Sequence, residues 1–584
     1  MPAPALVFRR PTSRLHPGVA TALVLVMALL PSLTGRAQTV ADPATALEPP
    51  LARPPLPAPR PQPPAPGIEL PPVPLPMEGP QRLAGLPRVF LRQIRFEGNT
   101  ALNDDELGQV ALPYLGREIT SEDLQDLRLA ITQAYVDRGY LNSGAVIPDQ
   151  EVTDHTIRIR IVEGRLAAIT VTGSGRLRPE YIGERLALGA EPPFNIHTLQ
   201  ERFQLLDADP LIATLKGEVL PGIRPGEAEL QVEVTPASPF ELEIQAANNQ
   251  APSVGSERLA TRGAFRNVTG WGDTLAATWG RTEGAGDLTA VYALPLSAQG
   301  TLIELRYAVT DAAIIEEPFA EIDIESELVS YGATLSHPVL SSLAQRLVLG
   351  LTVERRHSET FLLGRPFSFS PGVIDGESDV FALRFSQEYV RQASHEVLAA
   401  RSVISLGVDA WGATDNPVHP DGQFLAWLGQ FQWARLLGWG SQLIFRTDLQ
   451  LAAAPLLPME KFAVGGAGSV RGFRENLFVK DSGLAASLEW RIPILRLPLP
   501  LVETGVADGV VQLAPFFDWG ASWAKDVAAP DREALSSFGV GLRWEASARV
   551  HAQLYLARPL RDFDYADRDL QDDGIHFALS WRLL

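Results

Sequence analysis

The sequence predicts a mainly β protein, in which a transmembrane β-barrel follows two small α+β domains. Three observations carry this prediction. Apolar and charged residues alternate strictly over much of residues 238–584, and one order of strands and helices occurs twice between residues 87 and 237. The third is an export signal, after which no apolar run approaches the roughly 18 residues that a spanning helix needs. Only helices and closed barrels satisfy their backbone groups in lipid, so a membrane protein made from this chain must be a barrel.

Residues 1–37 are typical of a cleaved secretory signal peptide. Arginines at positions 9, 10 and 14 precede the apolar run "GVATALVLVMALLPSL", and the small residues Gly35 and Ala37 follow it. A basic segment, a short apolar segment and small residues before the cut define such signals. An uncleaved membrane anchor is the alternative, but the run is short for a bilayer. The mature protein is expected to begin near Gln38.

Residues 38–86 form a proline-rich segment that includes "PPLARPPLPAPRPQPPAPGIELPPVPLP". Such a stretch favours extended polyproline II and forms neither helix nor sheet. Its PxxP spacings allow a docking ligand, but a semi-rigid spacer is the favoured interpretation.

Residues 87–165 and 166–237 are each expected to fold as a small α+β domain. In both segments an alternating strand comes first, amphipathic helical segments follow, and alternating strands close the unit. In the second unit the longer helix is expected to run from Asn195 to Val219. Two such units, each of about 75 residues, can each bury a small core.

Residues 238–584 alternate in the manner of barrel strands. In "SSFGVGLRWEA", Phe538 and Leu542 face one way, whereas Arg543 and Glu545 face the other. Bulky apolar residues on one face and full charges on the opposite face are typical of a barrel with a wet lumen. A soluble β-sandwich shows the same local pattern, and the export signal favours the barrel. The length accommodates on the order of 14 to 18 strands.

Composition and motifs disfavour other classes. The net charge of -19 argues against nucleic-acid binding, and the lack of cysteine excludes disulfide and thiolate chemistry. No GxSxG, HExxH or Walker A motif is present, so neither an enzyme nor a cofactor is expected. The aspartate-rich stretch at residues 561–574 lacks EF-hand spacing, and a solvated loop is favoured over a calcium site.

Several stretches together resemble a known family, the TpsB-type (ShlB/FhaC/HecB-like) two-partner secretion transporters, within the POTRA-bearing outer-membrane barrels. "IRFEGNT" resembles the first strand of a POTRA domain, and "YVDRGYLNSGAVIPDQ" is the most specific stretch. "FAVGGAGSVRGFREN", "DSGLAASLEWRIP" and "APFFDWG" resemble the three C-terminal motifs in the expected order. The resemblance covers almost all of the chain after the proline-rich segment. The POTRA motif positions are Gly139, Tyr140, Pro148 and Gln150.

The resemblance implies a sixteen-stranded barrel, two POTRA domains and a loop at about residues 456–481 that folds into the lumen. In that loop Arg471 is expected to pair with Asp518, and the periodicity of "VQLAPFFDWGASW" also turns Asp518 toward the lumen. A guanidinium forked onto a carboxylate is a strong pairing that lysine cannot reproduce. The other expected site residues are Val470, Gly472 and Phe473 in the loop motif, and Phe516, Gly520 and Glu489 in support. Phe473 and Phe516 are expected to pack around the pair.

The resemblance also implies a function, namely secretion of one dedicated large exoprotein of adhesin or haemolysin type. The protein is expected in the outer membrane of a Gram-negative bacterium, with its POTRA domains in the periplasm. Expected partners are this exoprotein, membrane lipid and, during biogenesis, periplasmic chaperones and the barrel-assembly machinery. The alternatives are an insertase for other barrels and a passive porin or receptor. The sequence departs from the family pattern at two places. Residues 38–48 are too short for the N-terminal plug helix that the family often has, and the last residue is Leu584 rather than the usual aromatic residue.

Overall fold

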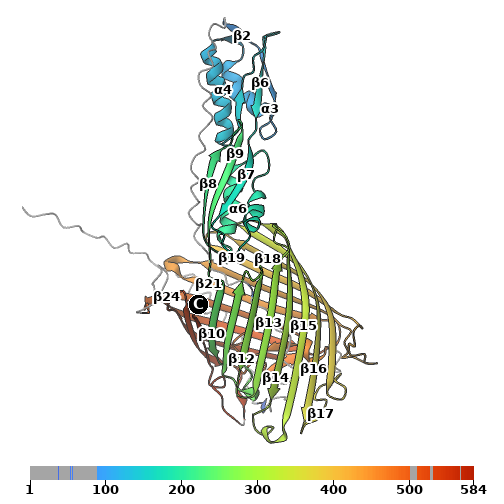
Figure 1. Ribbon diagram of the computed structural model, residues 1–584. Coiled ribbons are helices and arrows are strands. Elements are labelled where there is room, and N and C mark those ends of the chain that lie inside the picture. The colour runs from blue at the N-terminus through green and yellow to red at the C-terminus, as the bar shows by residue number, and fades with distance from the viewer. Residues whose placement is uncertain are drawn as a thin grey trace, which may run out of the picture.

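The computed structural model describes residues 37–38, 53, 56, 88–499, 509–525, 531–565 and 567–584. Two α+β units form a rod that stands on one end of a closed barrel (Figure 1). The predicted signal peptide and nearly all of the predicted proline-rich linker lie outside the described residues. In these ranges, no helix combines the length and the apolar character needed to cross a membrane.

The first unit packs two helices against a sheet with the strand order β3-β6-β5. Thr120 caps the longer helix, because its side chain accepts the Asp123 N–H while the Asp123 carboxylate accepts the Thr120 N–H. Leu127, Ile131 and Tyr135 project from that helix into the core and are fully buried. The elements are β2 (Val89–Leu91), β3 (Gln93–Glu97), α3 (Asp104–Ala111), β4 (Arg117–Ile119), α4 (Ser121–Val136), β5 (Gly144–Val146) and β6 (Thr156–Val162).

The second unit has the sheet order β7-β9-β8, which corresponds to β3-β6-β5, and its described residues form no counterparts of β2 and β4. Its elements are β7 (Arg165–Thr172), α5 (Pro179–Ala187), α6 (Ile196–Asp207), β8 (Ile212–Pro221) and β9 (Glu227–Pro236). The predicted helix from Asn195 to Val219 is therefore wrong beyond Asp207. Pro210 cannot continue a helix, and the residues after it bury Leu215 and Val219 by pairing with β9.

The motif "GYLNSG" joins the two units. Gly139 O accepts a hydrogen bond from Ile196 N at 2.9 Å, and Arg138 O accepts one from Asn195 Nδ2 at 3.0 Å. Asn142 Nδ2 donates to Gly226 O at 2.9 Å. The first turn of α6 is thereby fixed to the end of the first unit, which gives Gly139 a role in the relative orientation of the units.

Gly139→Ala is expected to disrupt this junction. Gly139 has φ +91°, and a Cβ there would lie 2.6 Å from the His197 ring. We expect a cost of about 1–3 kcal/mol and roughly tenfold faster proteolytic cleavage near the junction. The matched control is Gly183→Ala in α5, where a Cβ meets nothing within 4 Å and helix propensity improves. Equal cleavage rates for the two variants would contradict the prediction.

In the described part of the chain, sixteen strands close the barrel. The last strand pairs with the first, from Glu243↔Arg582 to Ala247↔Ala578. The two-residue strand β17 (Arg365–Pro366) only extends the β16 hairpin. The strands are β10 (Phe240–Ala247), β11 (Arg258–Arg266), β12 (Thr274–Arg281), β13 (Ala285–Pro295), β14 (Leu302–Ala313), β15 (Ile324–Ser341), β16 (Gln345–Leu362), β18 (Glu377–Gln392), β19 (Glu396–Gly407), β20 (Leu425–Leu436), β21 (Gln442–Ala452), β24 (Ser482–Arg496), β25 (Val510–Trp523), β26 (Arg532–Glu545), β27 (Val550–Pro559) and β29 (Ile575–Arg582).

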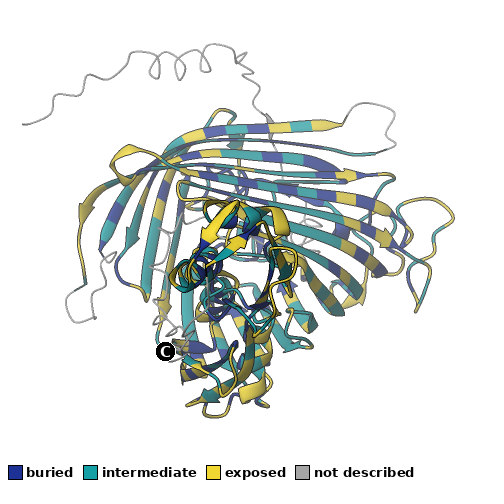
Figure 2. Ribbon diagram, turned by 90° about the horizontal axis from the view of Figure 1, so that it is seen from above, coloured by how far each residue is buried: buried dark blue, intermediate teal, exposed yellow. Residues whose placement is uncertain are grey.

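The two faces of each barrel strand differ as the alternation predicts. Residues along the strands switch between buried and exposed in short bands (Figure 2). On β24, the outward-facing Leu488 and Trp490 are 39% and 41% exposed, whereas Glu489 between them is 1% exposed. The exposed apolar face fits lipid, and the charged face lines the interior.

The second unit docks directly on the barrel. The Arg178 guanidinium lies 3.8 Å from the centre of the Trp271 ring, and Arg178 N donates to Gly270 O at 3.0 Å. Gly272 leaves space for Tyr181, since a Cβ at this position would lie 2.4 Å from that ring. These contacts join α5 to the turn between β11 and β12, so the rod is held at the rim of the barrel.

Candidate functional site

A loop between β21 and β24, residues 453–481, folds back into the barrel; it is called the inward loop below. Its two arms pair as β22 (Phe462–Val464) and β23 (Phe478–Lys480). At its tip, Gly465 N donates to Ser469 Oγ at 2.8 Å, and Gly466 N donates to Val470 O at 3.1 Å. The turn built in this way presents Arg471 to the barrel wall.

Arg471 lies against Asp518 of β25, the partner that the family resemblance implies. Arg471 Nε donates to Asp518 Oδ2 at 2.7 Å, and Nη2 donates to Oδ1 at 2.9 Å. The Arg471 backbone N–H also donates to Oδ2, at 3.1 Å. Arg471 is 5% exposed and Asp518 is fully buried. The contact is thus a buried, bidentate and charge-assisted pair, the geometry that arginine forms and lysine does not.

Glu489 completes the charge balance around this arginine. Arg471 Nη1 donates to Glu489 Oε2 at 2.6 Å, and Nη2 donates to Ser487 Oγ at 3.1 Å. The guanidinium also lies 3.6 Å from the centre of the Phe516 ring and 4.6 Å from that of Tyr555. All hydrogen-bonding nitrogens of Arg471 are therefore used. Arg471, Asp518 and Glu489 are called the latch below.

The other predicted residues of the loop motif make room for the latch or anchor it. A Cβ at Gly520 would lie 2.6 Å from Val464 and 2.8 Å from Val470, so the glycine admits the apolar core of the loop. Gly472 N donates to His576 Nε2 at 2.8 Å. Phe516 lies at the pair as expected, whereas Phe473 packs away from it, edge-on to Phe563 with the ring centres 6.0 Å apart.

The structure shows a second anchor that sequence reasoning missed, on the opposite arm of the inward loop. Glu460 accepts from Arg384 Nη2 at 2.8 Å and from Arg384 Nη1 at 3.0 Å. Arg356 Nη1 donates to the same carboxylate at 3.2 Å. Burial disfavours the charge, but the two arginines hold the pKa of Glu460 below its ordinary value. Because Arg356 and Arg384 belong to β16 and β18, the inward loop is fixed to two separate parts of the wall.

Glu460→Gln is expected to loosen the loop while keeping its shape. The change removes the shared carboxylate from two buried arginines, and breaking a buried ion pair costs about 3–5 kcal/mol. We expect the folded barrel to convert to its unfolded form at a lower temperature on unboiled gels. The control is Glu359→Gln, which removes a partly exposed pair with His357 outside the loop. A conversion temperature equal to that of the control would contradict this role for Glu460.

Arg474 forms a third anchor, toward the aspartate-rich stretch at residues 561–574. Its Nε and Nη2 donate to Asp572 at 2.7 and 2.8 Å, and Nη1 donates to Glu316 at 2.5 Å. Although burial disfavours its charge, these carboxylates raise the pKa of Arg474, which stays protonated. The sequence reasoning that favoured a solvated loop missed the structural role of Asp572. In the sequence, the feature that points to this anchor is a second arginine, Arg474, directly after the loop motif that ends at Phe473.

Arg53 and Leu56 of the proline-rich segment lie inside the barrel and line the cavity described below. Arg53 Nη2 donates to Ala463 O at 3.0 Å, and Nη1 contacts Asp448 at 3.4 Å. Its guanidinium stacks 4.5 Å from the centre of the Phe462 ring. Burial is the largest influence on Arg53 and lowers the pKa of its guanidinium. A spacer role alone does not account for these contacts with the inward loop.

The four POTRA motif positions lie in the rod, far along the chain from the latch. Gly139 belongs to the junction between the units, and the Tyr140 ring packs edge-on to Tyr135 at 5.9 Å. Gln150 binds the backbone of β6 twice, with Nε2 donating to Arg158 O at 2.8 Å and Oε1 accepting from Arg158 N at 2.7 Å. Gln150 Nε2 also contacts Pro148 O at 3.3 Å. These contacts are structural and leave the latch as the candidate functional site.

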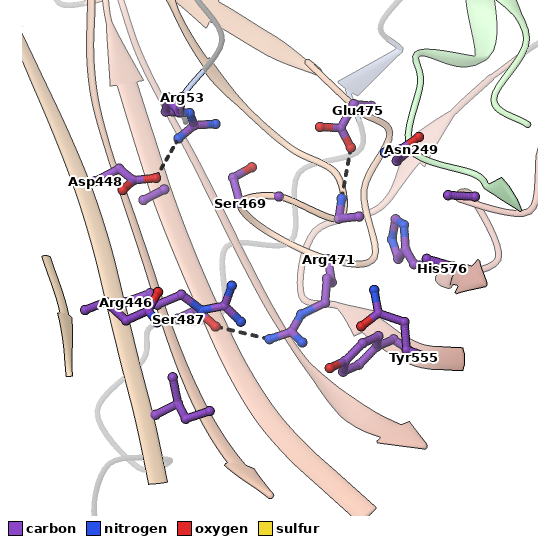
Figure 3. Close-up of a pocket in the computed structure, with 18 of the residues that line it drawn as sticks. Arg53, Asn249, Arg446, Asp448, Ser469, Arg471, Glu475, Ser487, Tyr555 and His576 are labelled. Carbon is purple, nitrogen blue, oxygen red and sulfur yellow. Dashed lines mark hydrogen bonds and ion pairs between the residues drawn. The ribbon is translucent and has the colours of Figure 1, made fainter. Parts of the chain in front are cut away.

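A cavity of about 690 Å³ lies beside the inward loop, with Arg446 and Arg471 directed into it (Figure 3). Five arginines line it, whereas its acidic lining residues are Asp448 and Glu475. The arginines are Arg53, Arg446, Arg471, Arg491 and Arg543. The interior near the latch is thus polar and rich in positive charge, although the chain as a whole is acidic.

Comparison with known proteins matches both parts of the chain. Residues 89–164 match the family model "POTRA domain, ShlB-type", and residues 226–544 match "Haemolysin secretion/activation protein ShlB/FhaC/HecB". The heme/hemopexin transporter protein HuxB of Haemophilus influenzae is 27% identical over 184 residues, which are 31% of this chain and 33% of HuxB. The outer membrane transporter CdiB of Dickeya dadantii is 23% identical over 442 residues, 72% of this chain and 76% of CdiB.

The fold is also similar to a solved structure. CdiB from Escherichia coli superposes with a TM-score of 0.64 at 19% identity, over 86% of this chain and 92% of CdiB. The chain spans about a third of the length of the HuxB relatives that it matches.

Proposed function

The chain belongs to the ShlB/FhaC/HecB family of haemolysin secretion/activation proteins, and we propose that it secretes a dedicated large exoprotein through its barrel. The observation that carries the proposal is a lumen crossed by a loop that ion pairs hold to the wall at separate places. A passive porin would not need the POTRA domain that precedes the barrel. In a transporter, the loop can close the lumen at rest and move aside for a substrate.

The protein resides in the outer membrane, with its POTRA domain in the periplasm. We infer that the second α+β unit is also a POTRA domain, because two helices follow its first strand and its three strands pair in the corresponding order. The proposed domain limits are residues 1–37 for the signal peptide, 38–86 for the linker, 87–165 and 166–237 for the POTRA domains and 238–584 for the barrel. Membrane lipid would contact the apolar outer face, and periplasmic chaperones and the barrel-assembly machinery would assist biogenesis.

The POTRA domains would receive the unfolded exoprotein in the periplasm. The sheet order β7-β9-β8 leaves β7 and β8 as edge strands within the described unit, and an extended segment can add to such an edge. The matched family is described by haemolysin secretion, which supports an exoprotein of adhesin or haemolysin type as cargo. The lumen of a sixteen-stranded barrel is wide enough for an extended chain once the loop moves. Folding of the exoprotein outside the cell would drive its passage.

The direct test compares culture media. Deleting the gene should remove one large protein from the medium, and restoring the gene on a plasmid should bring this protein back. The protein is identified by mass spectrometry. The outer-membrane protein profile should stay the same. A general loss of other barrels from the membrane would favour an insertase instead, and an unchanged medium would overturn the proposed function.

A further inference from the structure

Three arginines outside the latch line the cavity beside it. Arg446 is on β21, Arg491 on β24 and Arg543 on β26, and all three line the same cavity. Arg446 is exposed, and the described residues offer it no hydrogen bond or ion pair; in Figure 3 its guanidinium points into the cavity. Arg543 Nε is buried and has no hydrogen-bond partner. The exposed guanidinium of Arg446 is therefore free to donate to the carboxylate of a ligand in the cavity (Figure 3).

The carboxylates near these three arginines are fewer than the arginines, and Glu489 is already shared with Arg471. Arg491 Nε donates to Glu489 Oε1 at 2.7 Å, while the other oxygen of Glu489 holds Arg471 of the latch. Arg543 donates to Gln553 at 2.6 Å and to Tyr555 at 3.1 Å, both neutral side chains, and its nearest carboxylate, Glu545, is 3.7 Å away. Arg491 and Arg543 also lie close enough for their charges to repel. A further carboxylate in the cavity would relieve this repulsion.

The position of these arginines is also informative. Strand β24 runs from the inward loop toward the end of the barrel that carries the rod, so Arg491 follows Glu489 on the rod side. Arg543 pairs across the sheet with Gln512, likewise on the rod side of Asp518. A chain that enters from the rod therefore meets Arg491 and Arg543 before it meets the latch.

We propose that Arg446, Arg491 and Arg543 form a carboxylate-binding face that receives acidic side chains of the transported polypeptide. The inference rests on the proposed function for the identity of its ligand. A carboxylate bound by Arg491 competes with Glu489, which also holds Arg471. Arrival of an acidic segment thereby takes from Glu489 the Arg491 contact that helps to position it beside Arg471, and so loosens the support of the latch.

The test measures binding of fluorescein-labelled hexaglutamate to the purified full-length protein in detergent micelles, by fluorescence anisotropy. The wild type should bind hexaglutamate and not hexaglutamine, and added salt should weaken binding. The double variant Arg491→Gln/Arg543→Gln should bind at least about tenfold more weakly, because charge-assisted hydrogen bonds are lost. Arg258→Gln is the matched control, since Arg258 pairs with Asp287 at 2.7 Å on β11 and does not line the cavity.

Two further variants keep the test decisive. Arg446→Gln breaks no ion pair among the described residues, so it should fold normally and still weaken binding. Glu489→Gln removes the competing acid and should tighten binding. The proposal would be overturned if the double variant and Arg446→Gln bound hexaglutamate as tightly as the wild type does. It would also be overturned if the wild type bound hexaglutamine as tightly as hexaglutamate. If Glu489→Gln left the affinity for hexaglutamate unchanged, the proposed competition with Glu489 would be wrong. Because this binding test uses no exoprotein, intact hexaglutamate binding together with an unchanged medium after gene deletion would count against the proposed function alone.

Discussion

Replacing Arg471 by lysine is expected to reduce secretion by more than tenfold while the barrel still assembles. Lysine keeps the charge but cannot bind Asp518 through two parallel N–H groups and Glu489 through a third. The two buried carboxylates then lack a matching donor, and breaking a buried pair of this kind costs about 3–5 kcal/mol. The readout is the amount of exoprotein in the medium, relative to the amount of folded barrel in the outer membrane.

The control for this prediction is Arg401→Lys. Arg401 also binds a carboxylate through two nitrogens, at 3.2 and 2.6 Å from Glu388, but it lies on β19, and it also donates to Gln430 of the neighbouring strand β20 at 3.3 Å. Secretion by this variant should stay near the wild-type level. If both lysine variants secrete normally, the fork of Arg471 is not needed for transport.

A double-variant cycle tests whether Arg471 and Asp518 act as one unit. Arg471→Ala and Asp518→Ala should each impair secretion, and the double variant should be no worse than the poorer single variant, because either change already breaks the shared contact. Strictly additive effects on secretion would show that the two residues act independently.

Deletion of residues 87–237 is expected to abolish secretion and leave the barrel in the membrane. The barrel strands begin at Phe240, and β10 closes against β29 without help from the rod. The deletion removes the edge strands on which an unfolded exoprotein can dock. Secretion is measured in the medium, and assembly is measured as heat-modifiable migration of the barrel.

A less severe change serves as the control for the deletion. Gly183→Ala keeps both units and alters a helix position with open space around it, so secretion should continue. Normal secretion after the deletion would show that the barrel recognises its cargo without the rod. A barrel that fails to assemble would show that the contacts of Arg178 and Tyr181 with the rim are needed for folding instead.

Much of the fold follows from local patterns. Alternation along β24 and β26 predicts which side chains face lipid, because a barrel strand separates a dry exterior from a wet interior at every residue. The capped helix α4 is equally local, since Thr120 and Asp123 satisfy each other within one turn. The helix prediction failed after Asp207, where pairing with β9 decides that residues 212–221 form a strand. Strand pairing with a distant segment leaves little mark on helical spacing.

Part of the site can likewise be predicted from the sequence, and part of it cannot. The motif around Arg471 and the inward-facing position of Asp518 can be found in the sequence, and the structure brings the two together at 2.7 Å. Glu460 carries no comparable signal, and the position of Arg474 beside the motif does not reveal its partners, which lie 98 and 158 positions away along the chain. The contact of Arg53 with Asp448 is more distant still, 395 positions apart.

By itself the sequence determined an exported, mainly β chain with two α+β units, a charged lumen face and an arginine in a glycine-rich loop. Alternation, capping and composition act over a few residues, so they can be read without knowing the partners. Only the tertiary structure decided that the inward loop is anchored by Arg471, Glu460 and Arg474 at three places, and that Arg53 lies against it. These contacts depend on barrel closure, which brings strands distant in sequence around one lumen and makes each buried charge find an opposite one there.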